Sequence, residues 1–175
     1  MCAYKKLLLG LGEERSDETY LFTLLSLNLS LIVFGDKPAN LICFSEKTRN
    51  MKSLWKKEKA LFSNSKLKYI ELKDQGDYIA ILFYQEKLLE ERLNRKDESD
   101  FLENLGYAKD LGLEDKLEIL KKRFNQGAFD EIGIFLGYPL DDVTDFFSKK
   151  KKAKATGYWK VFNNMEESQR IFCYY

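Results

Sequence analysis

Two apolar segments on either side of a short polar turn constrain the fold of this chain more than any other feature. Residues 67–72 alternate between apolar and polar side chains, and residues 78–84 form an almost continuous apolar run. The residues between them, Lys73-Asp74-Gln75-Gly76-Asp77, have the composition of a hairpin loop. The sequence therefore predicts a central pair of antiparallel strands.

The segments around this hairpin predict a mixture of helices and further strands. Alternation predicts a strand at residues 39–45 and a last strand at residues 156–162. The lysines of a predicted helix at residues 50–62 are expected to face water. Amphipathic spacing or capping residues predict further helices at residues 86–94, 97–106, 110–126 and 139–147, and a terminal helix after Asn164.

Residues 21–34 are densely apolar, and their periodicity fits a buried helix as well as a strand. We favour a helix up to about Leu27 followed by an extended piece. No repeat or low-complexity linker interrupts the chain, so we expect a single domain over residues 1–175, with residues 1–15 as a loosely ordered N-terminal segment. The predicted fold class is α+β, with an antiparallel or mixed sheet of about four strands packed by several helices.

The absence of histidine excludes several classes of chemistry. None of the 175 residues is histidine, the side chain that titrates near neutral pH and most often binds transition metals. Catalysis by a Ser-His-Asp or Cys-His arrangement is therefore excluded. The cysteines at positions 2, 43 and 173 are too widely spaced for a metal-binding pair of the Cys-x-x-Cys kind. We predict no metal site and no cofactor.

Charge and apolar content limit the partners and the compartment. The formal net charge is +1, with lysines and acids interspersed, whereas nucleic-acid binding favours a strongly basic face. Residues 20–34 are interrupted by polar side chains and are too short to span a bilayer. An odd number of separated cysteines is typical of unpaired thiols in a reducing compartment. We therefore expect a cytoplasmic protein with no nucleic-acid or membrane partner, and its oligomeric state stays open.

Two pairs of adjacent acids are the candidates for catalysis. Asp130 and Glu131 precede a Gly-rich segment, and Asp141 and Asp142 follow Pro139. Adjacent carboxylates on a helix do not face one another, and favourable interaction with a helix N-terminus is sufficient to explain the second pair. Asp130 and Glu131 therefore remain as weak candidates for a general base or an ion ligand.

Three Gly-Tyr dipeptides recur in the sequence, at residues 106–107, 137–138 and 157–158. Glycine lets the backbone turn sharply, and tyrosine buries a ring while keeping a polar tip. One interpretation is packing at helix ends, and the other is an aromatic-lined pocket for a flat ligand or a partner peptide. For the second interpretation, the predicted binding residues are Glu131, Tyr138, Tyr158, Trp159 and Lys160.

Three blocks of the sequence resemble a known family. Residues 131–143, EIGIFLGYPLDDV, and residues 157–162, GYWKVF, resemble the hallmark blocks of an uncharacterised bacterial family, domain-of-unknown-function family 3793. Residues 37–41, KPANL, resemble its N-terminal block, and the order and spacing fit over roughly residues 20–175. The resemblance implies a small cytoplasmic protein of unassigned activity.

The chain departs from this family where its relatives carry histidine or cysteine. Members typically show His-Cys at the positions of Asn28 and Leu29, His at the position of Asp130, and often Cys near Ala155 or Thr156. A thiol with two imidazoles would suit a nucleophile–base pair, a metal site or a haem site in those relatives. Because this chain lacks these groups, we do not expect it to share such chemistry in the same form.

The sequence therefore favours a non-catalytic binding or regulatory protein, with an unknown small molecule or protein as its partner. One alternative is an enzyme that uses Asp130 or Glu131 as an acid–base group or ion ligand. A second alternative is an iron- or haem-linked accessory protein, in which Cys, Tyr or Met would replace the missing histidine. Complete burial of Tyr138 and Trp159 with no adjoining cavity would refute the predicted site.

Overall fold

The central element of the fold is a three-stranded antiparallel sheet with the order β1-β3-β2. The computed structural model describes residues 16–148, 153–156 and 159–166. Strands β2 and β3 form the hairpin that the sequence predicts, and β1 covers residues 39–45, as predicted. The bounds of the strands are Ala39–Ser45 for β1, Leu67–Gln75 for β2 and Tyr78–Gln85 for β3.

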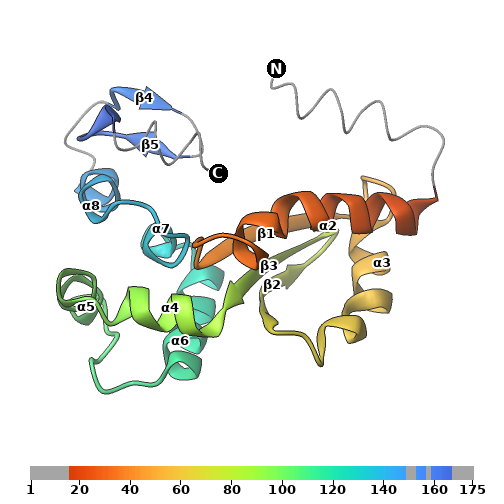
Figure 1. Cartoon of the computed structure of the whole chain (residues 1–175), viewed down its shortest axis with the longest axis horizontal. Helices are drawn as coiled ribbons and strands as arrows, with labels where there is room; N and C mark the ends of the chain where they lie inside the picture. The colour runs from red at the N-terminus through yellow and green to blue at the C-terminus, as the bar shows by residue number, and fades with distance from the viewer. Residues whose placement is uncertain (1–15, 149–152, 157–158, 167–175) are drawn as a thin grey trace.

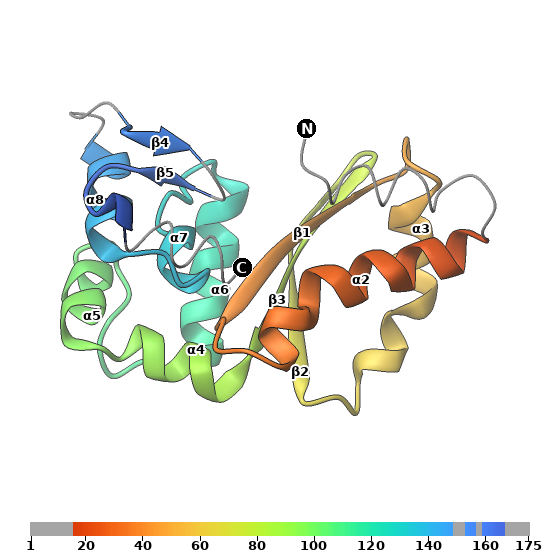
Figure 2. The same cartoon turned by 45° about the horizontal axis from the view of Figure 1, so that its top comes forward.

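The apolar run of β3 has a structural explanation in its central position. Its side chains alternate between the two faces of the sheet, and each face is covered by helices (Figure 2). Ala80 and Leu82 belong to one hydrophobic core, and Ile79, Ile81 and Phe83 belong to the other. All five are fully buried. A strand that is buried on both faces needs an uninterrupted apolar sequence.

One face of the sheet is covered by the N-terminal helices α2 (Asp17–Val33) and α3 (Met51–Glu58), with the 3₁₀ helix η1 (Lys59–Phe62). Trp55 of α3 is fully buried at the centre of this core. Its ring contacts those of Phe44 and Phe83, at centroid distances of 6.0 and 5.3 Å. Large aromatic side chains therefore account for much of the packing on this face.

The opposite face is covered by helices from the C-terminal half of the chain, which lie together on the other side of the sheet from α2 and α3 (Figures 1 and 2). Helix α6 packs along β2, and α7 packs against α4 and α8. These elements are α4 (Glu86–Leu93), α5 (Lys96–Glu103), α6 (Leu113–Asn125), α7 (Ile132–Phe135) and α8 (Leu140–Ser148), followed by β4 (Ala155–Thr156) and β5 (Lys160–Val161).

The fold confirms the predicted α+β class. The predicted last strand differs in detail, because the described part of residues 156–162 does not join the central sheet. Strands β4 and β5 instead pair with each other as a separate two-stranded antiparallel sheet beside α8 (Figure 2). The predicted terminal helix after Asn164 falls mostly outside the described residues, as does the segment 1–15.

Helix α2 corrects the prediction for residues 21–34. The predicted extended piece after Leu27 is wrong, because the helix continues without interruption to Val33. Its buried side chains are spaced by three or four residues, which is the spacing of one helix face: Leu21, Leu25, Leu29 and Ile32. Ser16 caps the helix by accepting a hydrogen bond from the Thr19 N–H. The alternation of leucines after Leu27 is therefore a coincidence of composition.

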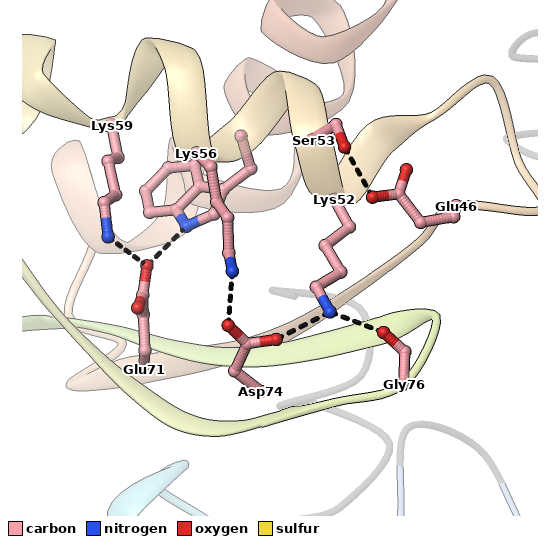
Figure 3. Close-up of polar contacts among 9 residues, drawn as sticks. Glu46, Lys52, Ser53, Lys56, Lys59, Glu71, Asp74 and Gly76 are labelled. Atoms are coloured by element: carbon pink, nitrogen blue, oxygen red, sulfur yellow. Dashed lines mark hydrogen bonds and ion pairs between the residues drawn. The ribbon is translucent and has the colours of Figure 1, made fainter.

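The expectation that the lysines of α3 and η1 face water is met only in part. Lys56 and Lys57 are exposed, whereas Lys52 is buried. Three of the lysines pair with carboxylates of the sheet (Figure 3). Lys52 is buried, and its Nζ lies 2.6 Å from an Asp74 carboxylate oxygen. Lys56 binds the other oxygen of Asp74. Lys59 donates to Glu71, which also accepts the Trp55 indole N–H. Ion pairs with β2 thus supplement the apolar contacts that hold α3 on the sheet.

In the described part of the chain, no helix combines the length and the apolar character that crossing a membrane requires.

Candidate functional site

A cavity of about 320 Å³ lies between α7, α8 and the segment that enters β5. Its walls are mostly apolar, and the charged residues among those that line it are Asp130, Asp142 and Lys160. A concave, apolar site with a few polar groups, of a volume near the lower end of known ligand pockets, is typical of small-molecule binding. The lining residues are Phe129, Asp130, Ile132, Gly133, Tyr138, Asp142, Val143, Phe146, Trp159 and Lys160.

The turn after α7 places Tyr138 in the cavity wall. The Tyr138 N–H donates to the Gly133 carbonyl at 2.9 Å, and the Gly137 N–H donates to the Ile134 carbonyl at 3.0 Å. This pair of hydrogen bonds is a Schellman motif, which requires a left-handed residue at the position of Gly137. Gly137 has φ of 85°, a conformation that glycine adopts without steric cost.

The dipeptide at residues 106–107 ends α5 in the same way. The Tyr107 N–H donates to Leu102 and the Gly106 N–H donates to Glu103, with Gly106 at φ 95°. Two of the three Gly-Tyr dipeptides are therefore helix C-terminal caps, as the first interpretation predicts. The third dipeptide, at residues 157–158, lies outside the described residues. Tyr138 combines both interpretations, because its ring also lines the cavity.

Gly133 permits close contact between α7 and its neighbours. A Cβ atom at this position would lie 2.8 Å from Val143 Cγ2 and 3.2 Å from Tyr138 Cδ2. Real Cβ atoms essentially never make contacts as short as the first of these distances. Val143 is buried and β-branched, so its side chain has little freedom to move away. The glycine in the Glu-Ile-Gly block is therefore a packing requirement of the cavity.

We expect Gly133→Ala to lower the free energy of unfolding by about 1–3 kcal/mol, because overpacking of a close contact forces neighbouring side chains or backbone to shift. Urea unfolding followed by circular dichroism measures this change. Gly112→Ala is the matched control, since its Cβ would make an ordinary contact of 3.9 Å with Asp115, and it should cost less than about 1 kcal/mol. Equal stability of the two variants would contradict the packing role of Gly133.

Trp159 forms part of the cavity wall and is hydrogen-bonded to Asp142. The Tyr138 and Trp159 rings are stacked, with centroids 4.6 Å apart and an interplanar angle of 24°. The Trp159 indole N–H donates to Asp142 Oδ2 at 2.8 Å. The other oxygen of Asp142 accepts the backbone N–H groups of Phe162 and Asn163, at 2.9 and 3.0 Å. Asp142 is buried at 2% exposure, so one carboxylate fixes both the indole and the backbone after β5.

The rim of the cavity is aromatic and carries two charges. Phe129 is partly exposed, and its ring lies 4.5 Å from that of Phe124 on α6. Phe146 of α8 is also partly exposed, and the Lys160 ammonium lies 5.3 Å from its ring centroid. Such a distance allows a cation–π interaction. Asp130 is the second charged residue at the rim.

Glu131 points away from the cavity into a buried ion pair. Its carboxylate is fully buried and accepts hydrogen bonds from the Arg123 Nε–H and from the Tyr107 hydroxyl, the latter at 2.9 Å. The hydrogen bond from Arg123 to Glu131 raises the pKa of the arginine. Burial, followed by the negative charge of Glu131, raises the pKa of Tyr107. The arrangement joins α6, the end of α5 and the start of α7.

Arg92 of α4 anchors the turn that carries Tyr138. One terminal nitrogen donates to the Tyr138 carbonyl at 2.6 Å, and the other lies 3.1 Å from a Glu98 carboxylate oxygen. Both side chains of this ion pair are largely buried. A planar guanidinium bonds two acceptors in a fixed geometry, so Arg92 positions the cavity wall without lining the cavity.

The block at residues 37–41 lies at the start of β1 and does not line this cavity. Lys37 is buried, and its ammonium donates to the Asn40 side chain at 3.2 Å. Burial lowers the pKa of Lys37 to about 8. The Asn40 amide in turn donates to the Asn28 carbonyl of α2 at 2.8 Å. This block therefore joins β1 to α2.

The structure brings together part of the predicted site. Asp130, Tyr138, Trp159 and Lys160 line one cavity, whereas Glu131 does not reach it and Tyr158 lies outside the described residues. Sequence reasoning missed the remaining lining residues of α7 and α8. The sequence predicted a helix over residues 139–147, which contains three of them, but gave no signal for a cavity.

The described residues contain no group of three or more cysteine, aspartate or glutamate side chains placed to hold a metal ion.

The fold and the cavity together define an α+β protein with a small aromatic site at the end of its helical layer. The family model described as "Protein of unknown function (DUF3793)" matches residues 25–175, and the chain belongs to this family. The match confirms the resemblance inferred from the sequence blocks. Neither a curated protein nor a solved structure shows significant similarity to the chain.

Proposed function

We propose that this chain is a non-catalytic cytoplasmic binding protein whose ligand is a small, planar, mostly apolar molecule. The observation that carries the proposal is the cavity bordered by the stacked Tyr138 and Trp159 rings. Apolar walls from α7 and α8 would keep water away from a bound ring system, and the ligand would enter at the exposed rim. Aromatic walls favour flat ligands because stacked or edge-to-face contacts add to the burial of apolar area.

The arrangement of the carboxylates supports binding over acid–base catalysis. Glu131, one of the two catalytic candidates, is paired with Arg123 and Tyr107 outside the cavity. Asp142 lines the cavity, but its oxygens accept hydrogen bonds from Trp159 and from the backbone after β5. General acid–base chemistry needs a carboxylate aimed at the substrate with further polar groups converging on it. Asp130 has no such convergent set among the described lining residues.

The distribution of exposed apolar side chains favours a small molecule over a protein partner. A docking surface for a protein is expected to form a contiguous apolar patch. In the described part of the chain, the large exposed apolar residues are distributed over several elements, and two of them line the cavity. They are Phe22, Val33 and Phe34 in or next to α2, Leu61 in η1, Phe129 and Phe146 at the cavity, and Met165 near the C-terminus.

Titration with N-phenyl-1-naphthylamine, a neutral planar dye that becomes fluorescent in apolar sites, tests this proposal. We expect saturable binding of one dye molecule per chain. Phe146→Ala removes one wall of the cavity and should weaken dye binding by about tenfold, because burial of a phenylalanine side chain is worth on the order of 1.5–3 kcal/mol. Phe34→Ala is the matched control, since it removes a phenylalanine ring that is 89% exposed and does not line the cavity.

The result that would overturn the proposal is the absence of saturable dye binding by the wild-type chain. Equal loss of binding in Phe146→Ala and Phe34→Ala would also contradict it, because the dye would then bind somewhere other than the cavity. Thermal unfolding of both variants, followed by circular dichroism, verifies that each remains folded. Since both rings are partly exposed, we expect both variants to fold.

A further inference from the structure

We propose that the ligand of this cavity carries an anionic group, such as a carboxylate, which pairs with Lys160 while its planar body occupies the apolar part. This inference rests on the proposed function and deepens it by naming the chemical class of the ligand. The inference rests on the position of Lys160 at the rim of the apolar cavity, beside the Phe146 ring. Lys160 forms no ion pair with the residues that the structure describes.

Lys160 differs in this respect from three lysines of α3 and η1. Lys52 and Lys56 both bind Asp74, and Lys59 binds Glu71 (Figure 3). Each of these three ammonium groups is therefore paired with a carboxylate of β2. No ion pair within the described residues joins Lys160 to a carboxylate, although Asp130 and Asp142 line the same cavity. Its positive charge remains available to a ligand.

The position of Lys160 suits recognition of an anion at the rim. Its backbone lies in β5, directly after Trp159, whose indole is fixed by Asp142. Its ammonium lies 5.3 Å from the centroid of the Phe146 ring, so a cavity wall lies on one side of the charge. A charged pair beside apolar walls is screened less by water than a fully exposed pair. A ligand carboxylate at the rim would therefore gain from Lys160 while its ring system contacts the aromatic walls.

The acidic residues that line the cavity do not offset the charge of Lys160. Asp130 is an opposing charge at the rim, but it forms no ion pair with Lys160 and does not neutralise it. Asp142 is occupied by N–H donors from Trp159, Phe162 and Asn163.

A matched set of three naphthalene probes tests the inference: 2-naphthoate, 2-naphthalenemethanol and 2-naphthylmethylammonium. They share one ring system and differ in charge, and their affinities follow from displacement of N-phenyl-1-naphthylamine. We expect 2-naphthoate to bind about fivefold more tightly than the neutral alcohol, which is the range of a partly exposed ion pair. The ammonium probe should bind most weakly, and the preference for 2-naphthoate should shrink at high salt.

Lys160→Met should abolish the preference for 2-naphthoate over the neutral alcohol. Lys122→Met is the matched control, since Lys122 is an exposed lysine of α6 that does not line the cavity, and it should keep the preference. Equal affinities of the wild-type chain for the three probes, or tightest binding of the ammonium probe, would overturn the anionic assignment and leave the proposed function standing. Failure of the wild-type chain to bind the dye at all would overturn both.

Discussion

Replacement of Asp142 by asparagine is expected to release Trp159 and the β5 segment from α8 while the central sheet stays folded. Asp142 Oδ2 accepts the Trp159 indole N–H, and Oδ1 accepts the backbone N–H groups of Phe162 and Asn163. An asparagine has one acceptor oxygen in place of two, and its amide nitrogen would meet an N–H donor. A buried donor left without an acceptor costs about 1–3 kcal/mol, and hydrogen bonds to charged groups are stronger than neutral ones.

The expected loss is about 3 kcal/mol in the attachment of this segment, which is enough to detach it for a substantial fraction of the time. Acrylamide quenching of tryptophan fluorescence measures the effect. The chain has two tryptophans, and Trp55 is fully buried in the core under α3. In Asp142→Asn, one of the two should become accessible to the quencher, and dye binding to the cavity should fall.

Asp141→Asn is a closely matched control for this experiment. Asp141 is the neighbouring acid in the first turn of α8, and its side chain is exposed. Both substitutions remove one negative charge from the same helix N-terminus, so both lose the same favourable interaction with the helix dipole. If the two variants showed the same quenching and the same dye affinity, the role assigned to Asp142 would be wrong.

The second large effect is expected at the buried ion pair of Arg123 and Glu131. Arg123→Met leaves the Glu131 carboxylate fully buried, with the Tyr107 hydroxyl as its remaining hydrogen-bond donor among the described residues. Removal of one partner of a buried pair typically costs about 3–5 kcal/mol, because a charge remains desolvated without compensation. The variant should therefore show a large drop in the midpoint of urea unfolding. Lys122→Met, the adjacent exposed lysine of α6, should change the stability by less than about 0.5 kcal/mol.

A second substitution separates the charge effect from loss of packing. Glu131→Gln in the Arg123→Met background removes the remaining buried charge and keeps an oxygen that accepts the Tyr107 hydroxyl. We expect this double variant to recover at least half of the stability lost in Arg123→Met, and a double-mutant cycle gives the coupling energy. A double variant less stable than Arg123→Met would show that the arginine acts through packing of its side chain and not through charge.

The strands and most helices were predictable because their signals are local. A polar turn between two apolar segments predicts the β2–β3 hairpin, and alternation predicts β1 with the observed bounds. Helix α2 was not predictable over its full length, because leucines after Leu27 satisfy both the helical and the extended periodicity. The helix is favoured because Leu29 and Ile32 contact the core under α3. This contact depends on residues far away in the sequence.

The candidate site was predictable in its aromatic residues and not in its geometry. The Gly-Tyr and Gly-Tyr-Trp-Lys patterns drew attention to Tyr138, Trp159 and Lys160, which the structure places around one cavity. The same reasoning selected Glu131, which faces α6 instead. Adjacent residues point in different directions from a helix start, so sequence position cannot distinguish Asp130 at the rim from Glu131 in the interior.

Residue type and local spacing in this chain determine the α+β class, the hairpin, the glycine caps after α5 and α7, and the exclusion of histidine chemistry. These properties depend on backbone conformation and on side-chain composition within a few residues. The tertiary structure alone decides that Asp142 holds Trp159 against Tyr138, that Arg123 neutralises Glu131, and that Lys160 stays outside an ion pair in the described structure. Each of these depends on which elements meet in space, because charge compensation and cavity shape follow from contacts between segments and not from their order.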